Sequence, residues 1–299
     1  MNLRRAALLQ LALIVLGVIL ISTLIIQEPS STAACLGSEC LHNTQKSYQY
    51  TIVTAASSNH FCPLLGFLYS ISDTLRLLPS DEQPRIVVYD LGLSPEERFK
   101  LNNITENGYA TEVVSFDYSK YPSFWNIKAK RGEYAWKTGI INEVGEKHPG
   151  VVLWMDSGDR ATPSFLRSVV AHITKNGYYS PTSTGFMGEF THPGMYKYFK
   201  APESRYSHIK NCNGAFIGYD SRNETIMSTL IRPFLDCAKV KKCIAPPGSS
   251  RINHRQDQSV FTYLVISRGW RCRNEEGLEG LSIHQDDDCK AQIVIHERI

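Results

Sequence analysis

Two aspartates stand directly after a short, strongly apolar stretch of the chain. Asp156 and Asp159 follow residues 151–155, which are expected to form a buried strand. Two carboxylates at the end of such a strand could hold a hard cation, Mn²⁺ or Mg²⁺, that neutralises a diphosphate. The intervening Ser157 and Gly158 are equally typical of a plain turn. These residues alone leave a metal site and a turn as open alternatives.

Polar side chains at three other places could serve the same chemistry. Lys137 lies near the start of a helix expected over 133–147, where an ammonium group and the helix dipole would both favour a phosphate. A solvated lysine on a helix face is the competing interpretation. Asn213 precedes a short strand and could belong only to a turn. Asp257 and Gln258 precede the apolar stretch 260–266, either as a helix N-terminus or as a charge and an amide placed for chemistry.

Two histidines near the end of the chain are candidates for a third metal ligand. His296 follows the strand-like stretch 291–295, and His284 follows 281–283. A neutral imidazole could complete a metal site begun by the aspartates. An ordinary surface position is the alternative for each histidine.

The elements that must position these residues alternate along the chain. Strands are expected over 50–54, 85–90, 111–116 and 151–155, and helices over 63–78, 94–107 and 133–147. Ser94, Pro95 and Glu97 form a capping box with proline at the first helical position. The alternation predicts an α/β fold with a mostly parallel sheet flanked by helices. Ligands of such sheets bind outside the carboxyl ends of the strands.

An apolar run precedes this domain. Residues 6–26 could cross a hydrocarbon core of about 30 Å at about 1.5 Å of rise per residue. Arg4 and Arg5 favour a cytoplasmic amino terminus. We therefore expect a tail (1–5), a transmembrane signal-anchor (6–26), a lumenal stem (27–47) and a folded domain (48–299). A signal peptide cleaved after the small residues 32–34 is the alternative.

The cysteines and the charge agree with a lumenal domain. All eight cysteines follow the apolar run, which suits disulfide bonds in an oxidising compartment. Plausible pairs are Cys237 with Cys243 and Cys35 with Cys40. Two glycosylation sequons begin at Asn103 and Asn223. The net charge of +3, without a basic stripe, argues against nucleic acid as a partner.

The order of five motifs carries a resemblance to a known family. They are the small residues and asparagine of 54–59, Asp-Leu-Gly-Leu-Ser at 90–94, Tyr-Ala-Trp-Lys at 134–137, Asn-Gly at 213–214 and Asp-Gln at 257–258. In this order the chain resembles the GT-A glycosyltransferases, and within them the branch of glycogenin and the bacterial lipopolysaccharide galactosyl- and glucosyltransferases. It is also similar to an uncharacterised family of animal type II membrane proteins with a nucleotide-diphospho-sugar transferase-like domain.

The resemblance implies an enzyme of the Golgi or endoplasmic reticulum membrane. It would move a sugar from a nucleotide sugar, with UDP as the expected nucleotide, to a hydroxyl of a glycan or glycoprotein, with retention of configuration. The resemblance implies a divalent cation, Mn²⁺ or Mg²⁺, held by Asp156, Asp159 and His296. The implied catalytic residues are Lys137, Asp257 and Gln258. The implied donor-binding residues are Ala55, Ala56, Asn59, Asp90 and Asn213.

Two departures from the family pattern keep other functions open. The motif Asp-Ser-Gly-Asp is one residue longer than Asp-x-Asp, which places Asp159 in doubt, and Lys137 stands where the family has arginine. One rival is a GT-A-fold module that has lost catalysis and binds glycans or a protein. The other is a hydrolase using Asp156 and Asp159 as an acid/base pair, although three residues of separation suit an inverting pair poorly.

Overall fold

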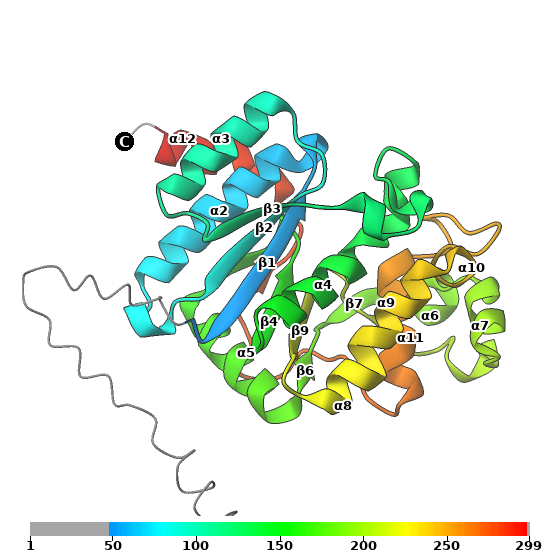
Figure 1. The fold of residues 1–299 in the computed structure, drawn as a ribbon. Helices are drawn as coiled ribbons and strands as arrows, with labels where there is room; N and C mark the ends of the chain where they lie inside the picture. The colour runs from blue at the N-terminus through cyan, green and yellow to red at the C-terminus, as the bar shows by residue number, and fades with distance from the viewer. Residues whose placement is uncertain (1–47, 298–299) are drawn as a thin grey trace, which may run out of the picture. The chain divides into compact units, whose positions relative to one another are not determined.

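The computed structural model describes residues 48–297, whose centre is a six-stranded sheet in the order β3-β2-β1-β4-β9-β6 (Figure 1). These strands are β1 (Tyr50–Ala56), β2 (Arg85–Asp90), β3 (Glu112–Ser115), β4 (Val151–Met155), β6 (Tyr178–Tyr179) and β9 (Phe216–Asp220). Strands β1 to β4 pair in parallel, and β9 runs antiparallel to β4 and β6. The predicted mostly parallel α/β sheet is confirmed.

The two faces of the sheet are buried under different helices (Figure 1). Along β1, Ile52 and Ala56 belong to one apolar cluster, whereas Val53 and Ala55 belong to the other. This split follows from the alternation of side chains along a strand. The first cluster includes residues of α2 (Phe61–Arg76), α3 (Pro95–Glu106) and α5 (Pro163–Asn176). The second includes residues of α4 (Trp136–Lys147), α9 (Arg232–Lys239) and α11 (Gln256–Ser267).

Shorter elements complete the domain. Strands β7 (Thr182–Phe186) and β8 (Lys210–Cys212) form one antiparallel pair, and β5 (Arg160–Ala161) and β10 (Leu281–Ser282) form another. The short helices are α6 (Met187–Phe190), α7 (Pro193–Phe199), α8 (Glu224–Ile226), α10 (Lys241–Ile244) and α12 (Cys289–His296). Single helical turns cover Ser58–His60, Ser80–Glu82, Tyr118–Lys120, Ser123–Trp125, Lys130–Tyr134, Glu203–Arg205, Met227–Ile231 and Asp286–Asp288.

Several sequence-based boundaries hold and two do not. The capping box of α3 forms as predicted, with Ser94 and Glu97 each accepting a backbone hydrogen bond from the other. Helix α4 begins only at Trp136, because Lys130–Tyr134 adopts left-handed backbone angles. The strand predicted over 291–295 is wrong, since these residues lie in helix α12. That helix packs on α2 and is fixed to it by a disulfide, and this packing decides the conformation of a short apolar stretch that either element could use.

Three disulfide bonds cross-link the described chain, two over long separations in sequence and one over six residues. Cys62–Cys289 joins α2 to α12, Cys212–Cys272 joins β8 to the segment after α11, and Cys237–Cys243 spans α9 and α10. The predicted pairing of Cys237 with Cys243 is confirmed. The predicted pair of Cys35 and Cys40 lies outside the described residues.

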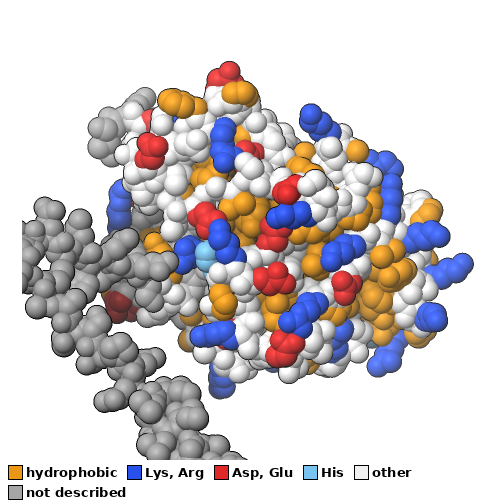
Figure 2. Space-filling model, viewed as in Figure 1, with side chains coloured by type: hydrophobic (Ala, Val, Ile, Leu, Met, Phe, Trp, Pro, Cys, Tyr) orange, Lys and Arg blue, Asp and Glu red, His pale blue; other side chains and the backbone are white. Residues whose placement is uncertain are grey.

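The predicted tail, transmembrane segment and stem (1–47) also lie outside the described residues. Within 48–297, none of the helices has the length and apolar character needed to span a bilayer. On the face shown in Figure 2, Lys and Arg side chains are interspersed with Asp and Glu side chains around the centre. That face therefore carries no continuous basic stripe.

Candidate active site

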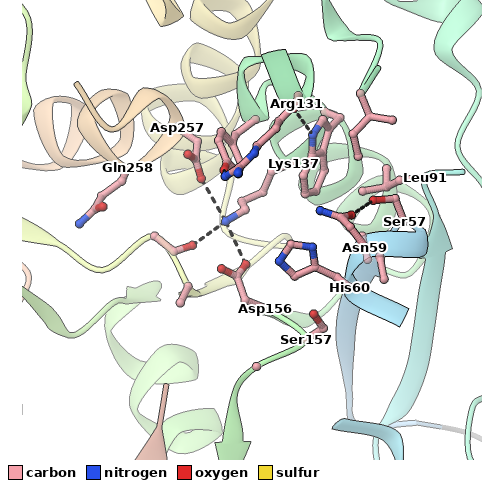
Figure 3. A pocket seen from close by; sticks show the side chains of 18 of the residues that line it. Ser57, Asn59, His60, Leu91, Arg131, Lys137, Asp156, Ser157, Asp257 and Gln258 are labelled. Atoms are coloured by element: carbon pink, nitrogen blue, oxygen red, sulfur yellow. Dashed lines mark hydrogen bonds and ion pairs between the residues drawn. The ribbon is translucent and has the colours of Figure 1, made fainter. Parts of the chain in front are cut away.

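A pocket of about 740 Å³ lies where strands β1 and β4 end, beside the start of α11. Its lining comes from segments far apart in the sequence, some of which are drawn in Figure 3. They are the stretch 55–60 after β1, Leu91 and Gly92 after β2, residues 127–137 before and within α4, 156–158 after β4, 213–215 before β9 and 251–258 before and within α11. The pocket thus occupies the edge of the sheet that the strand pattern predicts.

A buried ammonium group joins two carboxylates at the centre of the pocket wall. Lys137 Nζ lies 3.0 Å from Asp156 Oδ1 and 3.0 Å from Asp257 Oδ2, and it donates to the Gly214 carbonyl oxygen at 2.9 Å (Figure 3). Burial disfavours the charge on Lys137, but the two carboxylates outweigh burial and raise its pKa. Burial raises the pKa of Asp257, and the Lys137 ammonium opposes that rise. The Lys137 ammonium is therefore not solvated, and Asp156, Asp257 and the Gly214 carbonyl oxygen already surround it.

Asp156 is the member of this triad that faces the pocket. Its side chain is 34% exposed, whereas those of Lys137 and Asp257 are 5% and 6% exposed. Trp154 Nε1 donates a hydrogen bond of 2.7 Å to the same Oδ1 that Lys137 contacts. The ammonium also lies 5.1 Å from the centre of the Trp154 ring. These contacts fix the Asp156 carboxylate in one orientation at the end of β4.

The three predicted metal ligands are not brought together. Asp159 is fully buried, lines no part of the pocket, and has no hydrogen-bond partner for either carboxylate oxygen in the described chain. Burial, followed by the charge of Asp156, raises the pKa of Asp159 well above its usual range, which favours the neutral acid. His296 lies on α12, stacked on Tyr69 at 4.6 Å, with Nε2 3.1 Å from Asp73 Oδ2.

A divalent cation therefore does not fit the set of ligands that the sequence suggested. Among residues 48–297 there is no group of three or more His, Cys, Asp or Glu side chains able to hold a metal ion. Asp156 remains in the pocket, while Asp159 and His296 do not line it. His284, the other histidine considered, does line the pocket.

The predicted nucleotide-binding residues divide into two groups. Ala55, Ala56 and Asn59 line the pocket, and Asn59 Oδ1 accepts a hydrogen bond of 2.5 Å from Ser57 Oγ. Asp90 does not line it, because its carboxylate shapes the turn after β2. One of its oxygens accepts from the backbone N–H groups of residues 92 and 93, each at 2.7 Å, and the other pairs with Arg98.

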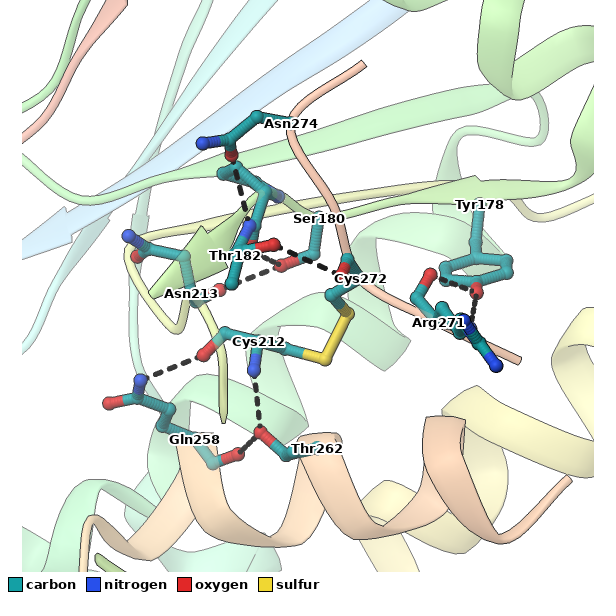
Figure 4. The surroundings of a disulfide bond; sticks show 11 residues. Tyr178, Ser180, Thr182, Cys212, Asn213, Gln258, Thr262, Arg271, Cys272 and Asn274 are labelled. Atoms are coloured by element: carbon teal, nitrogen blue, oxygen red, sulfur yellow. Dashed lines mark hydrogen bonds between the residues drawn. A yellow bond between two sulfur atoms is a disulfide. The ribbon is translucent and has the colours of Figure 1, made fainter. Parts of the chain in front are cut away.

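Asn213 and Gln258 line the pocket beside the Cys212–Cys272 disulfide (Figure 4). Asn213 Oδ1 accepts from the Ala215 backbone N–H at 2.8 Å and so shapes the turn before β9. Gln258 Nε2 donates to the Cys212 carbonyl oxygen at 2.7 Å. This hydrogen bond holds the start of α11 against β8, and the disulfide fixes β8 to the segment after the end of α11.

The polar stretch before α11 contains a buried histidine. His254 Nδ1 accepts from the His192 backbone N–H at 3.2 Å, so that Nε2 carries the proton and donates to the Ile244 carbonyl oxygen at 2.9 Å. Burial lowers the pKa of His254 to about 4. The imidazole is accordingly a neutral structural link between α7, α10 and α11 rather than a group of the pocket.

Basic side chains that the sequence did not single out form another wall. Arg131 Nη1 donates to the Tyr134 hydroxyl at 2.8 Å, and the Arg251 guanidinium lies 4.9 Å from the centre of the Tyr134 ring. Arg255 lies 4.5 Å from the centre of the Phe190 ring. All of these residues line the pocket. In the sequence, only their position in polar stretches could have pointed to these arginines. No regular spacing relates residue 131 to residues 251 and 255.

A left-handed turn places Arg131 and Tyr134 at the pocket. The φ angles of Lys130–Tyr134 are 47°, 56°, 63°, 50° and 55°, a conformation that costs L-residues about 1–2 kcal/mol each. Gly132 is required for a second reason, because an added Cβ would lie 2.2 Å from the Trp125 carbonyl oxygen. Trp136 Nε1 braces the turn by donating to the Arg131 carbonyl oxygen at 3.1 Å.

Comparison with known proteins finds solved structures of similar outline, three of which are given below. No family model and no curated protein matches the sequence. The galactosyltransferase LgtC, solved with donor and acceptor sugar analogues, has a TM-score of 0.44 and 16% identity over 70% of this chain and 68% of its own. Mouse xyloside xylosyltransferase 1 gives 0.46 and 13% over 75% and 85%, and the mannosyltransferase Ktr4p of S. cerevisiae gives 0.45 and 11% over 73% and 65%. All three are glycosyltransferases, but likeness at this level carries no argument about the activity of this chain.

Proposed function

We propose that this chain is a glycosyltransferase of the GT-A type that transfers a sugar from a nucleotide diphosphate, with UDP as the first candidate, to an acceptor hydroxyl. The observation that carries the proposal is the charge of the pocket. Its lining holds five Lys or Arg side chains and three Asp side chains, so it suits an anionic ligand. A volume of about 740 Å³ is within the range of about 300–1,000 Å³ typical of small-molecule sites.

The arrangement of side chains suggests how a donor would lie. Asn59, Ser57 and Leu91 stand at one end of the pocket and Gln258 at the other, with Lys137 and Asp156 between them (Figure 3). We place the base and ribose at the first end and the sugar at the second. The diphosphate then lies between them, alongside the basic wall.

In this pose each polar group has a distinct task. Loss of the nucleoside diphosphate leaves negative charge on the leaving oxygen, and preorganised positive charge beside it lowers that barrier. Lys137 holds Asp156 and Asp257 in place, and the fixed Asp156 carboxylate faces the positive charge that develops on the sugar ring. We name no protein nucleophile, and retention of configuration stays a prediction.

The setting of the enzyme is part of the same proposal. An anchor over 6–26 would place the domain in the lumen of the Golgi or endoplasmic reticulum, where a glycan or glycoprotein is the natural acceptor. Three disulfide bonds in the described chain support an oxidising compartment. The inactive binding module stays the second candidate, because Asp159 is buried away from the pocket.

The test is a screen of UDP- and GDP-sugars for hydrolysis and transfer by the purified full chain. Asp156→Asn should lower turnover by about a hundredfold or more. Asp73→Asn is the matched control, since Asp73 lies on α2 outside the pocket, and it should leave turnover unchanged. Donor binding without turnover in the wild type would favour the binding module, and absence of both would refute the proposal.

A further inference from the structure

Three guanidinium groups converge on one wall of the pocket. This arginine cluster consists of Arg131, Arg251 and Arg255. Tyr134 gathers the first two, with its hydroxyl accepting from Arg131 at 2.8 Å and its ring facing Arg251 at 4.9 Å. Arg255 enters the same lining from the start of α11, where its guanidinium lies 4.5 Å from the centre of the Phe190 ring. Burial, and after it the charge of Arg251, lowers the pKa of Arg255.

The arginine cluster is not paired directly with any carboxylate of the described chain, although the charge of Arg251 reaches Asp257 and lowers its pKa. In the part of the chain that the structure describes, no carboxylate forms an ion pair within 4.0 Å of any of its three members. Other arginines do have one, such as Arg160, which lies 2.6 Å from Asp288, and Arg167, which lies 2.6 Å from Glu82. Like charges held together without a partner are unfavourable. An anionic ligand at this wall would relieve the repulsion.

The backbone under the arginine cluster is held in an unfavourable conformation. Arg131 sits within the left-handed turn Lys130–Tyr134, and four of the five residues of that turn are not glycine. Such conformations persist where the surrounding structure imposes them, as the Trp136 hydrogen bond to the Arg131 carbonyl does here. The turn therefore fixes Arg131 at the pocket before any ligand arrives.

The opposite wall lacks the means to hold a cation in the predicted way. Oδ1 of Asp156 already accepts hydrogen bonds from Lys137 and Trp154, and Asp159 points to no part of the pocket lining. A diphosphate in this pocket thus meets the arginine cluster on one wall, whereas Asp156 and Asp257 are already paired with Lys137, and Asp286 is the third aspartate of the lining.

We infer that the pocket binds the diphosphate of its donor through the arginine cluster and needs no divalent cation to do so. The inference rests on the proposed function. Guanidinium groups match phosphate oxygens with two parallel hydrogen bonds, and they carry their charge at every physiological pH. Three of them supply the neutralisation that a bound cation would otherwise provide.

The experiment is calorimetry of UDP and GDP on the full chain, once in EDTA and once in Mn²⁺. We expect the Kd of the bound nucleotide to agree within about twofold between the two conditions, because the arginines rather than a cation neutralise the phosphates. Inorganic pyrophosphate should compete with the nucleotide in EDTA. Arg131→Ala and Arg255→Ala should each weaken binding about tenfold or more, and Arg131→Lys should be intermediate.

Arg205→Ala is the matched control. Arg205 is exposed and stacks over Tyr206 at 5.8 Å, as Arg251 does over Tyr134, but it lies outside the pocket. Its removal should leave the Kd unchanged. Binding that disappears in EDTA and returns with Mn²⁺ would overturn this inference and leave the proposed function standing, as would unaltered affinity in both alanine variants. No binding of either nucleotide in either condition would refute the proposed function itself.

Discussion

Replacing Lys137 by methionine should lower the free energy of unfolding by about 3–5 kcal/mol at pH 7, because it leaves a buried carboxylate without its counter-charge. The Asp257 side chain is 6% exposed and lies 3.0 Å from the ammonium that the substitution removes. Methionine fills a similar volume, so lost packing contributes little. Asp156 also loses a partner, but water reaches its side chain.

The loss of unfolding free energy in the Lys137→Met variant should grow as the pH rises. Burial already raises the pKa of Asp257, and loss of the ammonium raises it further. The folded state then binds a proton that the unfolded state releases near pH 4, so stability falls as pH rises from about 4 through the folded-state pKa. Unfolding by guanidinium chloride at pH 5 and at pH 8 measures the free energy of unfolding of the variant and the wild type, and the larger loss is expected at pH 8.

Two further variants make the result decisive. Lys147→Met removes the exposed ion pair with Glu112 and should change stability by about 1 kcal/mol or less. The double variant Lys137→Met with Asp257→Asn should recover part of the loss, because a neutral amide replaces the unpaired charge. A Lys137→Met protein as stable as the wild type, or equally impaired at both pH values, would refute the reasoning.

Three other predictions address the rest of the fold. Gly132→Ala should destabilise the protein by about 3 kcal/mol and abolish nucleotide binding, whereas Gly108→Ala, at positive φ but with open space around it, should lose about 1 kcal/mol; thermal unfolding and calorimetry compare them. As pH falls from about 6.5 to 4, protonation of the unfolded chain at His254 should remove about 3 kcal/mol of stability, and this slope should flatten in His254→Gln when denaturation is followed across that range. Loop lengths predict stability losses of about 5 kcal/mol for Cys62→Ser and about 2 kcal/mol for Cys237→Ser, and the reverse order in chemical unfolding would contradict the loop-entropy argument.

Much of the architecture could be predicted because it depends on local patterns. The apolar stretches before Asp156 and after Tyr50 indicate strands that are buried on both faces of a sheet. The capping box of Ser94 and Glu97 indicates the start of a helix within four residues. The order of the strands then brings the candidate residues of the pocket together. Lys137, Asp156 and Asp257 come from three separate segments, yet each was suspected because it stands at an element's end, and the fold brings all three into contact.

What could not be predicted depends on contacts between distant residues. Nothing local requires positive φ at Arg131 or Glu133. The turn is braced by a distant contact, the hydrogen bond from Trp136 Nε1 to the Arg131 carbonyl oxygen, and the Trp125 carbonyl oxygen leaves no room for a Cβ at Gly132. The burial of Asp159 follows from the path of the chain after β4, which its spacing from Asp156 does not reveal. His296 was assigned to a strand end because the short, mostly apolar stretch 291–295 fits the period of either a strand or a helix, and only the packing of α12 on α2 selects the helix.

The Cys62–Cys289 disulfide has a consequence for the synthesis of the protein. Its two cysteines are separated by 227 residues, so at about 5–20 residues per second the first waits roughly 10–45 s for the second to be made. During that interval four other cysteines emerge as competing partners, namely Cys212, Cys237, Cys243 and Cys272. In an oxidising compartment the native bond cannot form until Cys289 emerges, and a Cys62 that has mispaired before then must be released by thiol exchange. Pulse-labelled chains should accordingly contain transient species with mispaired disulfide bonds, and a disulfide isomerase should speed their disappearance.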